Sequence, residues 1–189
     1  MAALSEEQTM IRDQAKSWAS EQAPVQKFRE MRDSAVEQRF SATTWAEMIE
    51  MGWTGILVPE EFGGSDLGYL TFGVILEELG RQLTASPLFA SALVGTSAIL
   101  LGGNDEQKQS LLPKVVDGSE VLTLALEEGN HHEPTRIELQ AKASNSGFKL
   151  SGHKTFVLEG MAATTFIVAA RTSGKAGDQS GITLFLVPA

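Results

Sequence analysis

Two adjacent histidines followed by a glutamate are the side chains of this sequence that most directly suggest chemistry. His131, His132 and Glu133 are all residue types that bind zinc. Neighbouring residues of an extended chain point to opposite faces, so the two imidazole rings would rarely reach the same ion. The remaining histidine, His153, lies in an expected turn without ligand spacing to the pair. Because a zinc site needs three or four converging ligands, we expect no metal site.

The composition limits the other kinds of site. The 189 residues include no cysteine, which excludes disulfides, thiolate catalysis and thiolate-bound metal. Glycine pairs at 63–64 and 102–103 do not follow a strand with dinucleotide-binding spacing, so we interpret both pairs as helix stops. The formal net charge of -9 argues against a nucleic-acid partner, because nucleic-acid-binding proteins usually carry a basic face.

The apolar content indicates a globular protein without membrane-spanning segments. Hydrophobic residues make up 42% of the chain, enough for one sizeable core or for two small domains. The segment from Met1 to Glu7 is acidic and polar, unlike a signal peptide. The longest apolar region, from Pro87 to Leu101, is interrupted by Ser, Thr and Gly, so no transmembrane segment is expected. We therefore expect a cytoplasmic protein.

Helical periodicity dominates the first part of the chain. Ser5 and Gln8 have capping-box spacing, which predicts a helix that ends at Pro24. Further helices are expected over residues 25–33, from Ser41 to Gly52, over 69–83, from Ser86 to Leu101, and from Asn104 to Asp117. The helix before Leu101 is apolar on nearly all sides, so we expect it at the centre of a bundle. The three tryptophans, Trp18, Trp45 and Trp53, are expected to be largely buried.

From Val121 onward the pattern changes to alternation and short apolar runs, which are typical of strands. Strands are expected over 121–126, 137–143, 148–151, 154–158, 165–170 and 182–187. Ser151-Gly152 is a turn signal between the third and fourth of these. The sequence thus predicts an α+β fold. An α-helical bundle domain, residues 1–118, is followed by part of an antiparallel β-barrel or β-sandwich domain, residues 119–189.

Two stretches carry a resemblance to one family. Gly52-Trp53 is followed by an apolar run, then Pro59-Glu60 and Gly63-Gly64. A later stretch combines Gly152, Lys154, Phe156 and Val157 with Ala170-Arg171. In this order, both motifs resemble those of the acyl-CoA dehydrogenases, with Phe156 in place of Trp, Leu158 in place of Thr or Ser, and Glu159 in place of Asn. The chain would cover roughly the first half of such an enzyme, which continues with more β-domain and a second helical domain.

The resemblance implies FAD as the cofactor and α,β-dehydrogenation of an acyl-CoA thioester. Leu122 to Glu128 is similar to a family strand whose backbone follows the flavin ring, which makes Leu124, Leu126 and Glu127 expected contacts. Phe156, Val157 and Leu158 are the expected second contact. Leu158 cannot donate the hydrogen bond that the family hydroxyl gives to flavin N5. On the residues alone, the first stretch is equally an edge strand and the second equally part of the core.

A family loop that touches the flavin pyrophosphate and acyl-CoA is replaced here by Asn130 to Arg136. Thr135 and Arg136 are the natural substitutes for substrate binding, because a hydroxyl and a guanidinium suit phosphate. The catalytic base of the family comes from the later helical domain. The resemblance therefore implies no catalytic base among these residues, and the catalytic residue stays unknown.

The resemblance also implies partners. An electron-transfer flavoprotein or a similar acceptor would take the electrons, and the enzyme would form a homotetramer or a heteromeric assembly. Since the phosphate loop and the N5 hydroxyl are both changed, a non-catalytic partner subunit of a heteromeric acyl-CoA dehydrogenase is an alternative, and a helical interaction module is another. A flavin absorption band would distinguish the enzyme from both alternatives.

Overall fold

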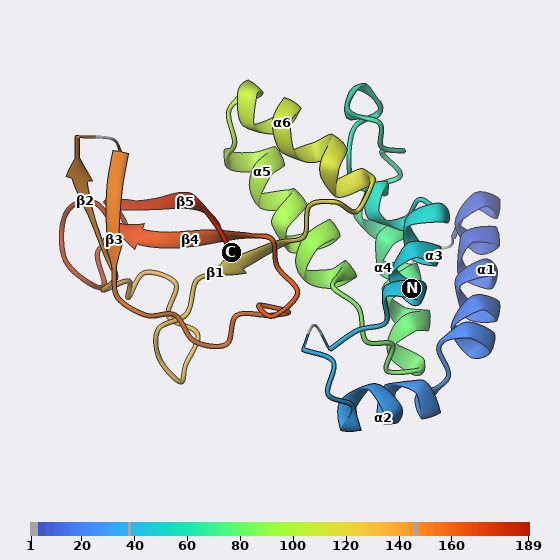
Figure 1. Cartoon of the computed structure of the whole chain (residues 1–189). Coiled ribbons are helices and arrows are strands. Elements are labelled where there is room, and N and C mark those ends of the chain that lie inside the picture. The colour runs from blue at the N-terminus through green and yellow to red at the C-terminus, as the bar shows by residue number, and fades with distance from the viewer. Residues whose placement is uncertain (1–3, 38, 146) are drawn as a thin grey trace.

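In the computed structural model, helices form the first part of the chain and a sheet forms the second (Figure 1). The structure describes residues 4–37, 39–145 and 147–189, so the first three residues of the expected 1–118 domain lie outside it. The helices are α1 (Glu6–Gln22), α2 (Val25–Asp33), α3 (Ala42–Glu50), α4 (Gly68–Arg81), α5 (Thr96–Gly102) and α6 (Asp105–Val116), with short 3-10 turns at Trp53–Gly55 and Glu60–Phe62.

Local sequence signals set the helix ends. The Ser5 hydroxyl accepts a hydrogen bond from the Gln8 amide at 3.1 Å, and the Gln8 side chain accepts one from the Ser5 amide at 3.0 Å. Asn104 and Gln107 repeat this capping box at the start of α6. These reciprocal bonds satisfy backbone donors that the first helical turn leaves free, which confirms the predicted helix starts.

A dense apolar core holds the helices together. Phe72 and Ile75 of α4 and Met48 of α3 are fully buried in one cluster with Trp53. Trp45 and Trp53 are buried as predicted. Trp18 is only partly buried: its ring packs edge-on against Trp53 at 5.1 Å, and its indole N–H donates to Glu47 at 2.7 Å, toward the surface.

The helix expected over 86–101 is divided in two. A π-helical segment, Phe89–Gly95, runs directly into α5. Gly95 lies so close to Leu122 that a side chain at this position would collide with it. The close approach seats the predicted central helix against the first strand, between the other helices and the sheet (Figure 1).

The five strands form one mixed sheet. They are β1 (Leu122–Ala125), β2 (Gln140–Ser144), β3 (Gly147–Ser151), β4 (Thr165–Arg171) and β5 (Ile182–Pro188). β2 pairs with β3, and β5 pairs along all of β4, in antiparallel fashion as expected. β1 and β2 both pair with β4 in parallel, which the expected antiparallel domain did not include. The order of helices followed by a β part is confirmed.

The strand predicted over 154–158 is wrong. This segment forms no strand, and Phe156 adopts a positive φ of 50°. The turn at Ser151-Gly152 therefore joins no hairpin, because β3 pairs with the preceding β2 instead. Polar contacts to the segment after β1 replace strand pairing: the Thr155 amide donates to the Glu127 carbonyl at 2.8 Å. The apolar run over 156–158 therefore belongs to a loop and not to a sheet.

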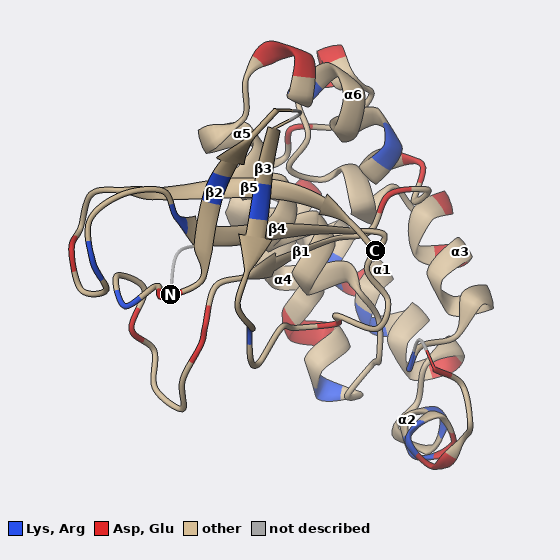
Figure 2. Cartoon of the chain, turned by 60° about the vertical axis from the view of Figure 1, so that its left-hand side comes forward, with Lys and Arg blue, Asp and Glu red and all other residues tan. Residues whose placement is uncertain are grey.

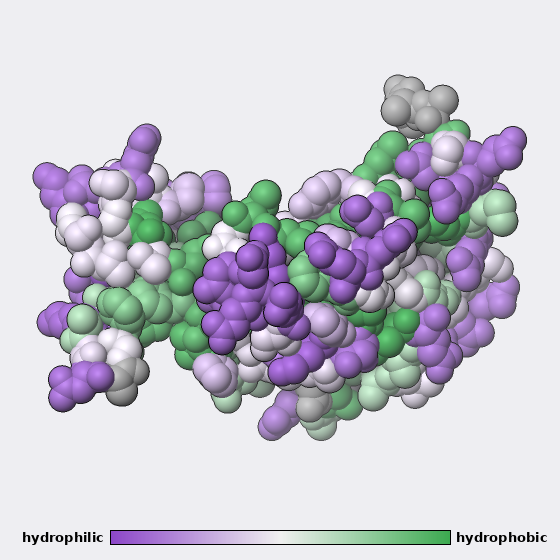
Figure 3. Space-filling view, turned by 90° about the horizontal axis from the view of Figure 1, so that it is seen from above, coloured by the Kyte–Doolittle hydropathy of each residue, from purple (hydrophilic) through white to green (hydrophobic). Residues whose placement is uncertain are grey.

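Charged and apolar residues are intermixed on the surface. Lys and Arg lie on several elements, including β2, β3 and α2, and gather on no single face (Figure 2). Seen from above, apolar residues lie exposed beside hydrophilic ones (Figure 3), and Leu101 and Leu184 are among the exposed large apolar side chains. Within the described part of the chain, no helix has the length and apolar character needed to cross a membrane.

Candidate functional site

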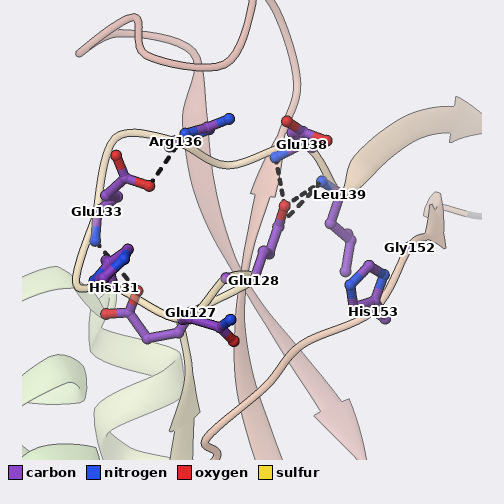
Figure 4. Close-up of a pocket in the computed structure, with 11 residues that line it drawn as sticks. Glu127, Glu128, His131, Glu133, Arg136, Glu138, Leu139, Gly152 and His153 are labelled. Carbon is purple, nitrogen blue, oxygen red and sulfur yellow. Dashed lines mark hydrogen bonds and ion pairs between the residues drawn. The ribbon is translucent and has the colours of Figure 1, made fainter.

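A pocket of about 520 Å³ lies where the segment between β1 and β2 meets the segment after β3 (Figure 4). Its lining consists of Glu127, Glu128, Gly129, Asn130, His131, Glu133, Arg136, Glu138, Leu139, Gly152 and His153. β1 and β2 share the edge of β4 opposite β5, so the 126–139 segment must leave the sheet and return to it. The pocket is a consequence of that excursion.

A buried ion pair fixes one side of this excursion. Lys154 Nζ lies 2.7 Å from Glu128 Oε1 and donates to the Leu126 carbonyl at 3.0 Å. The other contacts of the Glu128 carboxylate are the backbone amides of Glu138 at 2.7 Å and Leu139 at 3.1 Å. Burial alone would raise the pKa of Glu128, but the hydrogen bond from Lys154, the two amide donors and the lysine charge together hold that pKa below its usual value.

A buried arginine fixes the other side. The Arg171 side chain, at the end of β4, is 1% exposed. Its guanidinium donates to the carbonyls of Thr135 at 2.8 Å and Ile137 at 3.2 Å. It also donates to the carbonyls of Asp178 at 3.2 Å and Ser180 at 2.7 Å. Four backbone oxygens, rather than a carboxylate, therefore hold this charge and tie the 126–139 segment to the loop before β5.

The predicted substrate-binding residues lie on this anchored segment. The Thr135 carbonyl is held by Arg171, whereas Arg136 is exposed at the pocket and pairs with Glu133 at 3.3 Å. The pocket lining contains more glutamates than basic side chains. Arg136 is thus already partnered by an acid, and the surrounding charge disfavours a phosphate group.

The histidines do not converge. His132 Nδ1 lies 2.5 Å from Glu127 Oε1 in an exposed pair, while His131 and His153 line the pocket separately. Among residues 4–37, 39–145 and 147–189, no group of three or more His, Cys, Asp or Glu side chains is arranged to hold a metal ion.

The two predicted flavin stretches meet beside the pocket, although Leu124 packs against the apolar cluster shared with the helices and Val157 against the cluster on the other face of the sheet. Leu124 in β1 and Leu126 just after it are half-buried, as is Glu127. The Thr123 hydroxyl donates to the Leu158 carbonyl at 2.5 Å, which places the loop after β3 against β1. The structure therefore brings together the two stretches that the sequence marked separately.

The 156–161 loop leaves apolar side chains in solvent. Phe156 is 72% exposed and Met161 is 68% exposed, whereas Val157 packs into the apolar cluster of the sheet. Glu159 also has a positive φ, of 51°, and burial raises the pKa of its carboxyl group. Exposed aromatic and thioether side chains on a loop with this backbone strain indicate a surface made for contact.

The sequence did not indicate which residues hold this site in place. Lys154 and Arg171 were conspicuous only as motif positions, and Glu128 only as part of a strand. Glu128 and Lys154 are 26 residues apart, so no spacing rule connects them. The single available signal was the family motif, which includes Lys154 and Arg171.

Comparison with known proteins places the chain in a family. Residues 5–119 match the family model described as acyl-CoA dehydrogenase, N-terminal domain. The mitochondrial isovaleryl-CoA dehydrogenase of Pongo abelii is 32% identical over 189 residues, which cover 97% of this chain and 44% of that protein. The (2S)-methylsuccinyl-CoA dehydrogenase of Cereibacter sphaeroides is 31% identical, with 97% and 33% covered.

Solved structures agree with the sequence relatives. A variant of the Tcur3481-Tcur3483 steroid ACAD gives a TM-score of 0.83 at 35% identity, over 97% of this chain and 48% of its own. The ChsE4-ChsE5 complex from Mycobacterium tuberculosis gives 0.82 at 28% identity, over 100% and 49%. The chain spans less than half the length of each of these relatives. Since the family model covers more than half of the chain, the protein belongs to the acyl-CoA dehydrogenase family.

Proposed function

We propose that this chain is the N-terminal half of an FAD-dependent acyl-CoA dehydrogenase, which oxidises the α,β-bond of an acyl-CoA thioester. The observation that carries the proposal is that hydrogen bonds join two distant segments beside the exposed apolar side chains of Phe156 and Leu158. Hydrogen bonds from Thr123 to Leu158 and from Thr155 to Glu127 connect the end of β1 with the 156–161 loop. We further propose the division into a helical domain of residues 1–118 and a β-domain of residues 119–189.

The residues of this surface fit part of FAD. The exposed Phe156 ring and the exposed Leu158 side chain suit the flat, largely apolar isoalloxazine ring, because stacking needs only an aromatic face. The acidic pocket beside them does not suit the pyrophosphate. We therefore assign the ring contact to Leu124, Leu126, Glu127, Phe156, Val157 and Leu158, and we expect most of the phosphate contacts to come from other parts of the full-length protein.

In this proposal the chain positions the cofactor and does not carry the proton transfer. FAD, when bound, supplies the hydride acceptor. Phe156 covers one face of the ring site and excludes water from it, while the end of β1 presents backbone groups to the ring edge. Leu158 offers no hydrogen-bond donor through its side chain. Thr135 and Arg136 stay candidates for the acyl-CoA phosphates, at a cost from the neighbouring Glu133.

A second candidate function is a non-catalytic subunit of a heteromeric acyl-CoA dehydrogenase. Two observations favour it: Leu158 replaces a hydroxyl donor, and one related structure is the ChsE4-ChsE5 complex of two different chains. From the family we further propose a homotetramer or a heteromeric assembly. We also propose an electron-transfer flavoprotein, or a similar protein, as the electron acceptor. A cytoplasmic location likewise stays a prediction.

The ring contact can be tested with two phenylalanine variants. Phe156→Ala should weaken FAD binding to the full-length protein about three- to tenfold, because lost aromatic packing costs about 0.5–1.5 kcal/mol beyond area burial. Phe148→Ala is the matched control, since Phe148 is also more than half exposed but packs against Phe185, on the sheet. Equal FAD affinity and an equal flavin spectrum in both variants and the parent would contradict the assignment.

Activity gives a separate test of the missing base. The acceptor atom of a general base must come within about 2.6–3.2 Å of the atom that carries the proton. The 189-residue chain, supplied with FAD, several acyl-CoA thioesters and an artificial acceptor, should show no thioester-dependent reduction. The intact protein should be yellow and active. Turnover by the 189 residues alone would place a base among them, and a colourless intact protein would favour the non-catalytic subunit.

A further inference from the structure

A buried ion pair joins the two segments that carry the proposed flavin surface. The Glu128 and Lys154 side chains are 11% and 7% exposed, and their charged groups are 2.7 Å apart. Lys154 lies two residues before Phe156, and Glu128 directly follows Glu127. Each partner therefore lies within two residues of the proposed ring contact, while its own side chain is largely shielded from solvent.

Each charged group of the pair has further ligands, all from the backbone. Lys154 reaches the Leu126 carbonyl at 3.0 Å, at the end of β1. Glu128 receives the amides of Glu138 and Leu139, where the chain returns toward β2 (Figure 4). The segments after β1, before β2 and after β3 are thus joined by two side chains. The Glu128 carboxylate binds the lysine and both amides.

We propose that Glu128 and Lys154 are positioning residues, which align the 156–161 loop with the end of β1 and so set the geometry of the ring contact. The link to the flavin ring rests on the proposed function, whereas the alignment of the two segments rests on the observed contacts. Without Lys154, the Glu128 carboxylate would be a buried charge without a cation. Breaking one partner of such a pair is strongly destabilising, because the remaining charge is uncompensated.

The inference predicts an effect at residues that Lys154 does not touch. In Lys154→Met, amide hydrogen exchange at Glu138 and Leu139, and at the adjoining Thr155, should be at least about tenfold faster, since the buried carboxylate without its cation is held less firmly and the segments that it joins open more often. Lys154→Arg should restore most of the protection. The matched control is Lys149→Met, which removes an exposed lysine of β3 from the same sheet.

A titration distinguishes positioning by charge from simple loss of packing. Glu128 shares its surroundings with Lys154, Glu127, Glu138, Arg136, His131 and His153. The carboxyl carbon of Glu128, followed by NMR, should titrate below the usual glutamate range in the parent chain. In Lys154→Met it should titrate at higher pH, because burial then acts without the opposing cation. In Lys149→Met it should not move.

FAD titration by flavin fluorescence completes the experiment. In the full-length protein, Lys154→Met should weaken FAD binding at least about tenfold, whereas Lys149→Met should not. Unchanged amide exchange or an unchanged Glu128 titration in Lys154→Met would overturn the inference, as would faster exchange with unchanged FAD affinity. A full-length protein that binds no FAD would count against the proposed function, and the exchange and titration would still decide the alignment.

Discussion

The helical part and the β part of this protein are held together by different physical means. The helical core contains large apolar side chains such as Trp53, Phe72 and Met48. The buried cluster of the sheet consists mainly of alanines with Leu139 and Val168, which bury much less apolar area. Arg171 is instead among the largest fully buried side chains of the whole chain.

This difference has a functional meaning. Large apolar side chains supply most of the packing in the helical part, whereas charged anchors can hold irregular segments at fixed places near a surface. In the β part, Arg171 and the Glu128–Lys154 pair hold backbone groups that belong to no strand. The segments with the proposed site residues are therefore fixed by directional polar contacts, and their stability should respond to pH and to charge changes.

The largest effect should come from the helical core. Phe72→Ala, at a fully buried position, should lower the free energy of unfolding by about 3–5 kcal/mol, because it removes apolar contacts and leaves a cavity. Urea unfolding followed by tryptophan fluorescence measures the loss. Phe89→Ala, at a half-exposed position in the neighbouring π-helical segment, is the control and should cost much less. Similar losses of stability in Phe72→Ala and Phe89→Ala would mean that the helical part does not depend on its buried apolar core.

The next effect should come from the guanidinium anchor. Arg171→Met keeps an unbranched side chain of similar reach but removes the guanidinium from four carbonyls, of which that of Thr135 keeps the Gly177 amide as a donor. A stranded buried polar group costs about 1–3 kcal/mol, and we expect a loss near the upper end of that range, since several are stranded together. Arg136→Met, at an exposed position, should change stability by far less. Urea unfolding measures both. A loss under 1 kcal/mol for Arg171→Met would mean that water replaces the guanidinium at low cost.

The same contrast explains what could be predicted from the sequence. Helix starts at Ser5, Ser41 and Asn104 were predictable because capping depends on residues within one turn. The strands that form β1, β3, β4 and β5 were predictable from short apolar runs. The segment over 154–158 was not, because its conformation depends on Glu127 and Glu128, which precede it by 26 or more residues. The sheet order was missed for the same reason, since both parallel pairs join distant segments.

The candidate site shows the limit more sharply. The resemblance indicated Phe156 and Leu158, and the structure brings their loop against β1. Composition gave no sign that Arg136 pairs with Glu133, or that the pocket beside it is acidic. Charge complementarity is a property of side chains that meet in space, and periodicity along the chain does not report it.

A smaller effect, which depends on pH, should distinguish the β part from the helical part. The folded pKa of Glu128 lies below its unfolded value, so its stabilising contribution is present above the unfolded pKa and is lost as the pH falls through the folded pKa. The difference in stability between the parent chain and Glu128→Gln should therefore shrink as the pH falls below the ordinary glutamate pKa. Phe72→Ala should show a nearly constant difference over the same range. Urea unfolding at a series of pH values measures both differences, and parallel profiles would contradict the charged anchor.

The smallest effect should come from a helix cap, which acts only on its own helix. The Asn104 side chain accepts from the Gln107 amide at 2.8 Å, and the Gln107 side chain accepts from the Asn104 amide at 2.9 Å. Asn104→Ala should cost about 1 kcal/mol, the usual loss for a side-chain cap, at every pH where the fold is intact. Asn104→Asp is the control, because aspartate caps equally well and its charge suits a helix start, although Asp105 and Glu106 oppose it. Urea unfolding of both variants should rank alanine below aspartate. A loss as large as that of Phe72→Ala would mean that this cap holds the contact of α6 with the core as well as the first turn, and that local polar bonds also govern packing in the helical part.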